Sequence, residues 1–289
     1  MMKVGLVLEG GAMRGMFTAG VLDTFLENKI EVDGIIGVSA GALFGVNYFS
    51  NQKGRAIEYN KRYAKDPRYI SLSSLLFTGN MVNKKFAFYK MSEKLYPFDN
   101  DTYLKNGKDF YAVVTNVETG KAEYKKLKDP LNQMEILRAT SALPMASKFV
   151  DLGGKKYLDG GISDSIPINK FLSLGYDKII VVLTQPIDFR QKPLSEKVVS
   201  RLKKRFKNYP NLLDSLLNRY IKYNKTLDKI FELEKEGKIF VIRPHDKINI
   251  NIVRKNKVKL QKAYDMGIED TNKILSDLKK YLRHKKNEN

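Results

Sequence analysis

Apolar residues in the N-terminal part of the chain occur in short runs separated by polar and glycine-rich stretches. Val4-Gly5-Leu6-Val7-Leu8 is typical of a buried strand, and the pattern from Gly15 to Asn28 predicts a helix. A second apolar run contains Ile35-Ile36, and the small residues after Ser39 favour a second helix. This β-α-β-α order predicts a parallel sheet, with both connecting loops at the carboxyl ends of strands, where open sheets place their functional sites.

Further apolar runs extend the predicted sheet. We expect a buried strand from Phe110 to Val117 that pairs with Ala122 to Lys126, a near-continuous apolar strand from Lys178 to Leu183, and a strand from Lys238 to Ile242. Residues from about 55 to 104 are richer in aromatic and polar side chains and predict a helical insertion.

The sequence Gly37-Val38-Ser39-Ala40-Gly41 joins the second predicted strand to the second predicted helix. Its glycines allow the sharp strand-to-helix turn of a nucleophile elbow, which exposes the serine hydroxyl at the N-terminus of a helix. The earlier loop Leu8-Glu9-Gly10-Gly11-Ala12-Met13-Arg14-Gly15 can supply backbone N–H groups that hold the charge developing on an attacked carbonyl oxygen. On these residues alone, a helix-capping serine in a glycine-rich turn is the alternative.

A serine nucleophile needs a general base within hydrogen-bond reach, and the chain has only two histidines. His284 lies in a basic terminal tail, and His245 follows the last predicted strand in a loop. Carboxylates are therefore the main candidates, with His245 as the alternative. Asp159 is favoured because it ends a short predicted strand and precedes Gly160-Gly161, which permit close approach of another loop. An Asp-Gly hairpin turn is the other interpretation of these residues.

Four motifs occur in a defined order along the chain. Together, in this order, they are far more specific than any single motif. They are the glycine loop with Arg14, the Gly-X-Ser-X-Gly elbow, Arg138-Ala139-Thr140-Ser141-Ala142-Leu143-Pro144, and Leu158-Asp159-Gly160-Gly161-Ile162-Ser163-Asp164-Ser165-Ile166-Pro167. In this order they resemble the patatin-like phospholipase family, over roughly Lys3 to Thr184. The resemblance implies a three-layer α/β/α fold with a mostly parallel central sheet, and the activity of a bacterial-type lipid acyl hydrolase.

The resemblance also implies a serine–aspartate dyad, without cofactor or metal. Carried over by position, Ser39 is the nucleophile and Asp159 the general base, and the oxyanion loop consists of Gly10, Gly11 and Ala12. The supporting positions are Arg14, Gly15, Gly37, Gly41, Gly160 and Gly161. Ala12 departs from the third consecutive glycine of many members; its N–H is retained, but a positive φ there would be strained. Arg14 is expected either to bind a lipid phosphate or to brace the loop through backbone carbonyls.

The implied reaction is attack of Ser39 on an ester of a lipid, followed by hydrolysis of the acyl-enzyme. The insertion at 55–104 would then either form the wall or lid of the acyl-chain site or be ordinary packing. Two other functions stay open. One is a catalytically silent, basic, membrane-associated scaffold or regulator, and the other is an acyltransferase that uses the same dyad.

Composition sets the size and the compartment that we expect. With 289 residues, 43% of them hydrophobic, the chain can bury a large α/β core. We assign a catalytic core to residues 1–184 and a basic helical region to 185–289, which is expected to pack on the same body because no linker separates the two. The absence of cysteine excludes disulfides and thiolate metal sites. The apolar run before Glu9 is too short for a signal peptide, so we expect a cytoplasmic protein.

The formal net charge of +20 is unevenly distributed. Residues 190–225 contain eleven basic side chains and two acidic ones. A helical projection of this segment places four apolar residues on one side: Val198, Val199, Leu202 and Phe206. The opposite side carries Lys197, Arg201, Lys204 and Arg205. Such a helix either makes peripheral contact with an anionic membrane or packs its apolar stripe on the core. Nucleic acid is disfavoured as a partner because the chain shows no motif for binding it.

Overall fold

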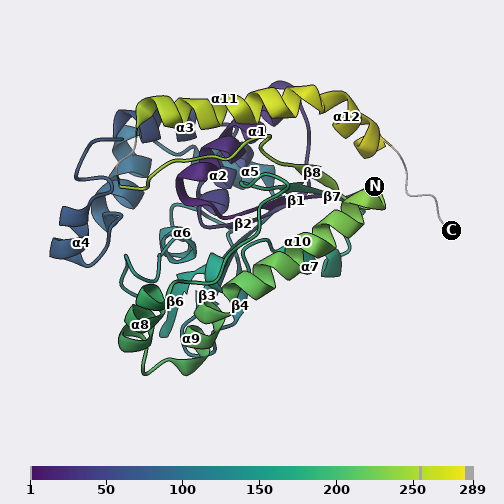
Figure 1. Cartoon of the computed structure of the whole chain (residues 1–289). Helices are drawn as coiled ribbons and strands as arrows, with labels where there is room; N and C mark the ends of the chain where they lie inside the picture. The colour runs from purple at the N-terminus through teal and green to yellow at the C-terminus, as the bar shows by residue number, and fades with distance from the viewer. Residues whose placement is uncertain (1, 254–255, 284–289) are drawn as a thin grey trace.

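The computed structural model describes residues 2–253 and 256–283, and eight strands of this part form one central sheet with helices on both faces (Figure 1). The strands are β1 (Val4–Leu8), β2 (Gly34–Val38), β3 (Asp109–Asn116), β4 (Ala122–Lys126), β5 (Val150–Leu152), β6 (Lys155–Asp159), β7 (Lys178–Val182) and β8 (Phe240–Ile242). The α-helices are α1 (Gly15–Glu27), α2 (Ala40–Phe49), α3 (Arg55–Arg62), α4 (Leu72–Thr78), α5 (Asn100–Asn106), α6 (Met134–Thr140), α7 (Ile168–Ser173), α8 (Glu196–Arg205), α9 (Pro210–Leu217), α10 (Arg219–Lys235), α11 (Lys257–Lys273) and α12 (Leu275–Arg283). Short 3₁₀ helices are η1 (Ala12–Arg14) and η3 (Gly160–Ile162), and a π-helix is η2 (Lys84–Leu95).

The sheet has the order β5-β6-β3-β2-β1-β7-β8, and β4 also pairs with β3. From β8 through β7, β1 and β2 to β3 all neighbours are parallel, whereas β4 and β6 run antiparallel to β3, and β5 runs antiparallel to β6. The central sheet is thus mostly parallel, as predicted. The last strand, β8, comes from the C-terminal region and completes the same sheet beside β7.

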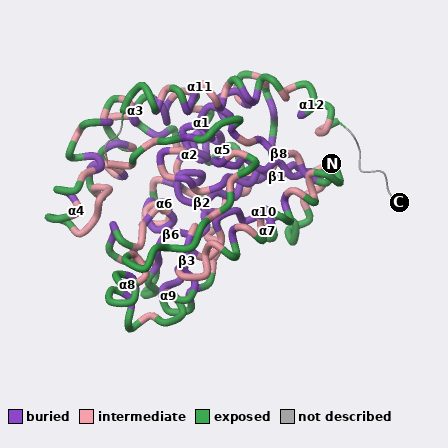
Figure 2. The backbone as a smooth tube through the Cα atoms, in the orientation of Figure 1, coloured by how far each residue is buried: buried purple, intermediate pink, exposed green. Residues whose placement is uncertain are grey.

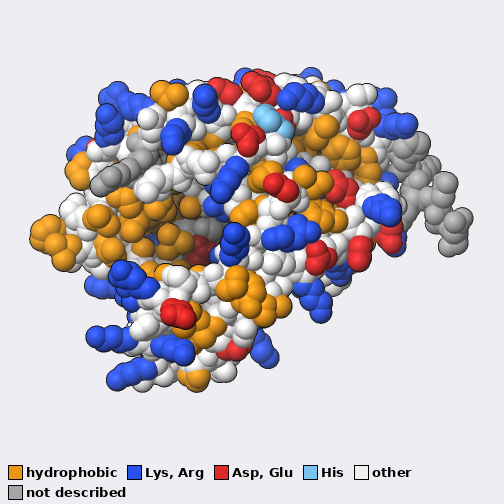
Figure 3. Space-filling view, in the orientation of Figure 1, with side chains coloured by type: hydrophobic (Ala, Val, Ile, Leu, Met, Phe, Trp, Pro, Cys, Tyr) orange, Lys and Arg blue, Asp and Glu red, His pale blue; other side chains and the backbone are white. Residues whose placement is uncertain are grey.

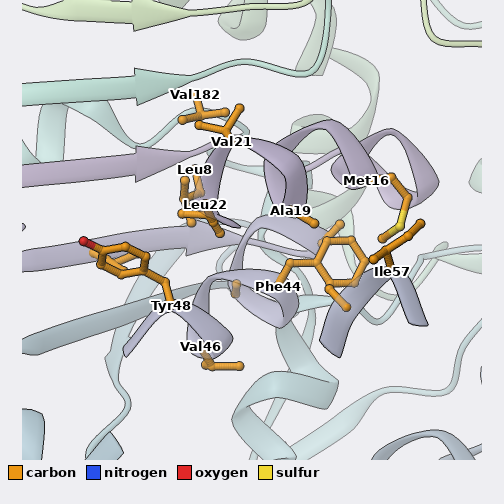
Figure 4. Close-up of a cluster of buried hydrophobic side chains, with 14 of the residues drawn as sticks. Leu8, Met16, Ala19, Val21, Leu22, Phe44, Val46, Tyr48, Ile57 and Val182 are labelled. Atoms are coloured by element: carbon orange, nitrogen blue, oxygen red, sulfur yellow. The ribbon is translucent and has the colours of Figure 1, made fainter. Parts of the chain in front are cut away.

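Apolar side chains cover both faces of this sheet because successive residues of a strand point to opposite sides. Leu6 and Leu8 of β1 belong to the core that includes α1, α2 and α11, whereas Val7 belongs to the core formed with α7 and α10. Figure 4 shows Val182 beside Val21 of α1, and Leu8 beside Leu22 of the same helix. Burial is concentrated along the strands and decreases toward the outer helices (Figure 2). The predicted three-layer α/β/α fold is confirmed.

The C-terminal region is fixed to the rest of the molecule by a close helix crossing. Helix α11 lies along α1 (Figure 1). Gly20 and Gly267 are at the contact, where an added Cβ on Gly267 would clash with the backbone carbonyl of Phe17. The Tyr264 hydroxyl of α11 donates to the Asp23 carboxylate of α1 over 2.7 Å. Small residues therefore allow the two helices to approach closely.

The aromatic segment at 55–104 contains the helices α3, α4 and η2 and most of α5, and several of its aromatic side chains are buried. Phe86, Phe88 and Phe98 are buried in the core on the α1 side of the sheet. Within the described chain, none of its residues lines the cavity that contains Ser39. The wall of that cavity therefore comes from elsewhere.

The predicted basic amphipathic helix is α8. Its residue Leu202 and the following Phe206 are 2% and 0% exposed and pack with Leu212 and Phe149. The apolar stripe thus faces the protein itself, and the basic side chains of α8 face solvent. No helix in the described parts of the chain combines the length and the apolar character needed to cross a membrane.

Candidate active site

Ser39 occupies a strained turn between β2 and α2. Its backbone has φ 53° and ψ −121°, a left-handed conformation that costs a residue with a side chain about 1–2 kcal/mol. Neighbouring groups hold this conformation: the Ser39 amide donates to the Thr140 hydroxyl over 3.0 Å, and that hydroxyl donates to the Val113 carbonyl over 2.5 Å. Gly37 and Gly41 flank the turn, and a Cβ on Gly41 would collide with the carbonyl oxygen of Leu8. The predicted elbow geometry is present.

Asp159 is the last residue of β6 and is 5% exposed. Its carboxylate accepts a hydrogen bond of 2.7 Å from the Gly161 amide, and its own amide donates to the Ala142 carbonyl over 2.9 Å. The adjacent Gly160 packs so closely on Val113 that a Cβ would not fit. Burial raises the pKa of Asp159 to about 6, although hydrogen bonds from the Ser39 hydroxyl and the Gly161 amide oppose this shift. The structure thus brings Ser39 and Asp159 together.

The glycine loop follows β1 and faces the same place. Gly10 donates its amide to the Ser165 carbonyl over 3.5 Å, whereas no acceptor for the Gly11 or Ala12 amide is found among the residues described. Those two amides are therefore the better candidates for an oxyanion hole. Ala12 has φ 48°, so the strain expected from an alanine at this position is present.

The Arg14 side chain forms a hydrogen bond with another side chain next to the glycine loop. Its Nε donates to the Thr184 hydroxyl over 3.4 Å, and the Thr184 amide donates to the Glu9 carboxylate over 2.5 Å. Glu9 is 1% exposed and accepts a second hydrogen bond, of 2.7 Å, from the Tyr223 hydroxyl. The partner of Arg14 is thus a threonine hydroxyl, whereas the sequence suggested backbone carbonyls or a lipid phosphate, and Arg14 also lines the cavity. Gly15 begins α1 in contact with Ala40, which brings the N-termini of α1 and α2 together.

Ser39 and Asp159 open into a cavity of about 280 Å³. Its polar end also contains the glycine loop, and its cationic side chains are Arg14, Lys192 and Arg219. Its apolar wall consists of Leu143, Pro144, Met145, Ile162, Leu194, Val198, Leu202, Leu216 and Leu217. Figure 3 shows the surface hollowed between orange side chains in the left half of the view. More than half of the apolar wall comes from residues after 190.

Arg219 is a site residue that the sequence patterns did not identify. It is the first residue of α10, and its Nε donates to the Gly161 carbonyl over 2.5 Å and to the Ser165 hydroxyl over 3.3 Å. Because the Gly161 amide holds the Asp159 carboxylate, Arg219 fixes the same short loop from the other side. Its positive charge also opposes the rise in the Asp159 pKa. In the sequence it is one of eleven basic residues between 190 and 225, and no local signal distinguishes it.

The histidine alternative is not supported by position. His245 Nδ1 lies 2.7 Å from the Asp270 carboxylate of α11, and His245 lines a separate depression together with Arg243 and Asp246. His284 lies outside the described residues. Within those residues, no group of three or more acidic or histidine side chains is arranged to hold a metal ion.

Comparisons with known proteins agree with the motifs. Residues 6–172 match the model of a family described as patatin-like phospholipase, and residues 209–283 match a domain of unknown function, DUF6363. The uncharacterized protein YjjU of Escherichia coli is 32% identical over 66% of this chain and 54% of its own length. Lysophospholipase NTE1 of Scheffersomyces stipitis is 23% identical over 96% of this chain, which corresponds to only 18% of that protein.

Among solved structures, VipD from Legionella pneumophila aligns with 96% of this chain and 67% of its own, at 12% identity and a TM-score of 0.46. The match of the family model covers more than half of the residues and includes both Ser39 and Asp159. The chain therefore belongs to the patatin-like phospholipase family.

Proposed function

We propose that this protein is a serine lipid acyl hydrolase of the lysophospholipase or phospholipase A kind, with Ser39 as nucleophile and Asp159 as general base. One observation carries the proposal: a serine on a strained elbow and a buried carboxylate share a cavity that has free amides at one end and an apolar wall. The family membership and the name of the NTE1 relative, a lysophospholipase, support the same substrate class.

The proposed acylation step needs a nucleophile, a base and an oxyanion hole. The Ser39 hydroxyl attacks the carbonyl carbon of the ester while its proton passes to Asp159. The Gly11 and Ala12 amides, together with the N-terminus of α2, stabilise the charge on the carbonyl oxygen. When the tetrahedral intermediate collapses, the carbon–oxygen bond to the alcohol breaks, and the alcohol takes the proton from Asp159.

Deacylation repeats these steps with water. Water attacks the acyl-enzyme carbonyl and gives its proton to Asp159; the fatty acid leaves, and the proton returns to Ser39. The apolar wall around Leu202 and Leu216 suits the hydrocarbon part of the acyl group.

Burial makes Asp159 a better base than an ordinary aspartate. Its pKa is raised to about 6, which brings it closer to the pKa of the serine hydroxyl whose proton it must accept. The carboxylate must be ionised to act, so turnover should decrease as the pH falls below about 6.

The proposal is tested by hydrolysis of a short-chain nitrophenyl ester and of lysophosphatidylcholine by the wild type, Ser39→Ala and Ser173→Ala. Ser173 lies on the exposed part of α7 and serves as the matched control. We expect Ser39→Ala to lose about 10³-fold or more in kcat, with Ser173→Ala unchanged. A silent but folded wild type would favour the scaffold alternative. A larger yield of transesterified product than of free acid, with glycerol present, would favour the acyltransferase.

A further inference from the structure

Helix α4 shows the opposite of the usual polarity of a surface helix. Its buried residue is Ser74, whose hydroxyl donates to the Asn80 carbonyl over 2.8 Å. Its large apolar side chains point outward: Leu72 is 62% exposed, Leu76 79% and Phe77 84%. We call these three residues the α4 patch. A surface helix ordinarily turns its apolar stripe toward the core, so large apolar side chains gathered in solvent indicate an interaction site.

The α4 patch lies next to the opening of the Ser39 cavity. The segment after α4 is fixed to the loop that carries the cavity wall: the Met81 amide donates to the Ala146 carbonyl over 2.8 Å, and the Lys148 amide donates to the Asn80 side chain over 3.0 Å. Met145, on the same loop, lines the cavity and is 40% exposed. In Figure 3 the orange side chains over α4, at the left edge, continue to the hollow.

Basic side chains border this apolar surface. The Lys148 side chain lies over Gly79, which ends α4, and an Arg205 terminal nitrogen donates to the Ser147 carbonyl over 3.0 Å. On α8 the exposed Arg201 and Lys204 lie on the same side of the helix as Arg205, by their spacing of three and four residues. Blue side chains accordingly surround the lower left of the molecule beside the patch (Figure 3).

We propose that the α4 patch and its basic border form the surface by which the protein docks on an anionic phospholipid bilayer, with the cavity opening facing the lipid. Apolar side chains enter the boundary between head groups and acyl chains, and the basic border binds anionic head groups. A second copy of the chain fits less well, because it would bring two basic borders together. This inference rests on the proposed function only for the reason why the protein would dock, because docking itself needs no turnover.

The test measures docking in the absence of hydrolysis. Each variant carries Ser39→Ala, and its sedimentation with vesicles of phosphatidylglycerol and phosphatidylcholine is compared with that on phosphatidylcholine alone. We expect Leu76→Ser with Phe77→Ser to weaken binding to anionic vesicles by roughly tenfold or more. Leu172→Ser is the control, because Leu172 is an exposed leucine of α7, far from α4 (Figure 1). Arg201→Glu with Lys204→Glu should remove the preference for anionic vesicles.

Two results would overturn the proposal. One is equal vesicle binding by the double serine variant and the control. The other is that the Ser39→Ala protein is a dimer whereas the variant that also carries Leu76→Ser and Phe77→Ser is a monomer. This result would make the patch a protein interface. The same substitutions are also made in a protein that keeps Ser39, and these variants are assayed for nitrophenyl ester hydrolysis. This assay separates the docking inference from the proposed function. If docking is lost while ester hydrolysis persists, both hold; if the wild type binds vesicles but cleaves no ester, only the proposed function fails.

Discussion

At the scale of single residues, the candidate site combines backbone strain with a buried charge. Ala12 and Ser39 both adopt positive φ without being glycine, and both face the cavity. Strain of this kind persists only where surrounding contacts enforce it, here the Thr140 hydrogen bond at Ser39. Asp159 adds a carboxylate that burial makes costly to ionise.

Replacement of Ala12 by glycine should stabilise the protein. Its φ of 48° is unfavourable for alanine and readily adopted by glycine, although glycine loses more entropy on folding. We expect Ala12→Gly to raise the free energy of unfolding by about 0.5–1 kcal/mol and to retain the amide of the candidate oxyanion hole. Urea denaturation would measure it, with Ala19→Gly in the middle of α1 as a control that should destabilise.

Asp159→Asn should abolish turnover and increase stability above pH 6. The folded state binds the Asp159 proton more tightly than the unfolded state does. The free energy of unfolding of the wild type therefore decreases as the pH rises from about 4 to about 6. The asparagine can still accept from the Gly161 amide and carries no charge. The variant should therefore exceed the wild type by about 3 kcal/mol at pH 7.5 and by little at pH 4. A difference that does not change with pH would contradict the raised pKa.

At the scale of elements, two helices that are remote in sequence position the candidate reacting residues. Helix α6 supplies Thr140, which holds the elbow, and α10 begins with Arg219, which holds the loop after Asp159. One turn along α10, the Tyr223 hydroxyl donates to the carboxylate of Glu9 in the glycine loop. Helix α10 thus contacts the loops that carry both halves of the candidate chemistry.

Arg219 should act as a positioning residue that sets the acid limb of the pH profile. Loss of its charge in Arg219→Met should raise the Asp159 pKa further, so the acid limb of kcat/KM should move to higher pH by about one unit. Arg219→Lys keeps the charge and should restore most of this shift. If both variants show the wild-type limb at reduced activity, the role of Arg219 is structural.

Local patterns were sufficient for most of the strands, although not for β5, and they also indicated the candidate site. Apolar runs predicted β1, β3 and β7, and β4 was predicted as the partner of β3. The elbow spacing indicated Ser39, whereas Asp159 was favoured only once the other motifs were read together with it. The contribution of Arg219 was not predictable, because its contact with Gly161 joins segments 58 residues apart that share no local pattern. The exposure of α4 was not predictable either, since Leu75-Leu76-Phe77 resembles core sequence and side-chain type does not determine burial.

At the scale of the molecule, the region matched by the patatin family and the C-terminal region form one structure. Strand β8 extends the sheet beside β7, α11 covers α1, and residues of α8 and α9 complete the cavity wall. The domain of unknown function thus begins within the part of the chain that shapes the candidate site.

The crossing of α1 and α11 should be sensitive to one methyl group. Gly267→Ala places a Cβ against the Phe17 carbonyl, so the two helices must separate. We expect a loss of about 1–3 kcal/mol in the free energy of unfolding, measured by urea denaturation. Lys262→Ala, at an exposed position of the same helix, should change stability by less than about 0.5 kcal/mol. Equal stability of the two variants would show that the crossing tolerates the methyl group.

The shared sheet has a consequence for biosynthesis. During translation Ser39 and Asp159 emerge early, but β7 keeps an unpaired edge until β8 is made, and α1 stays uncovered until α11 follows. A ribosome-bound chain therefore carries both candidate reacting residues before Arg219, Tyr223 and the wall from α8 and α9 exist. If the proposed function holds, competence to act on a lipid requires synthesis of the chain through α11, well beyond the two candidate reacting residues.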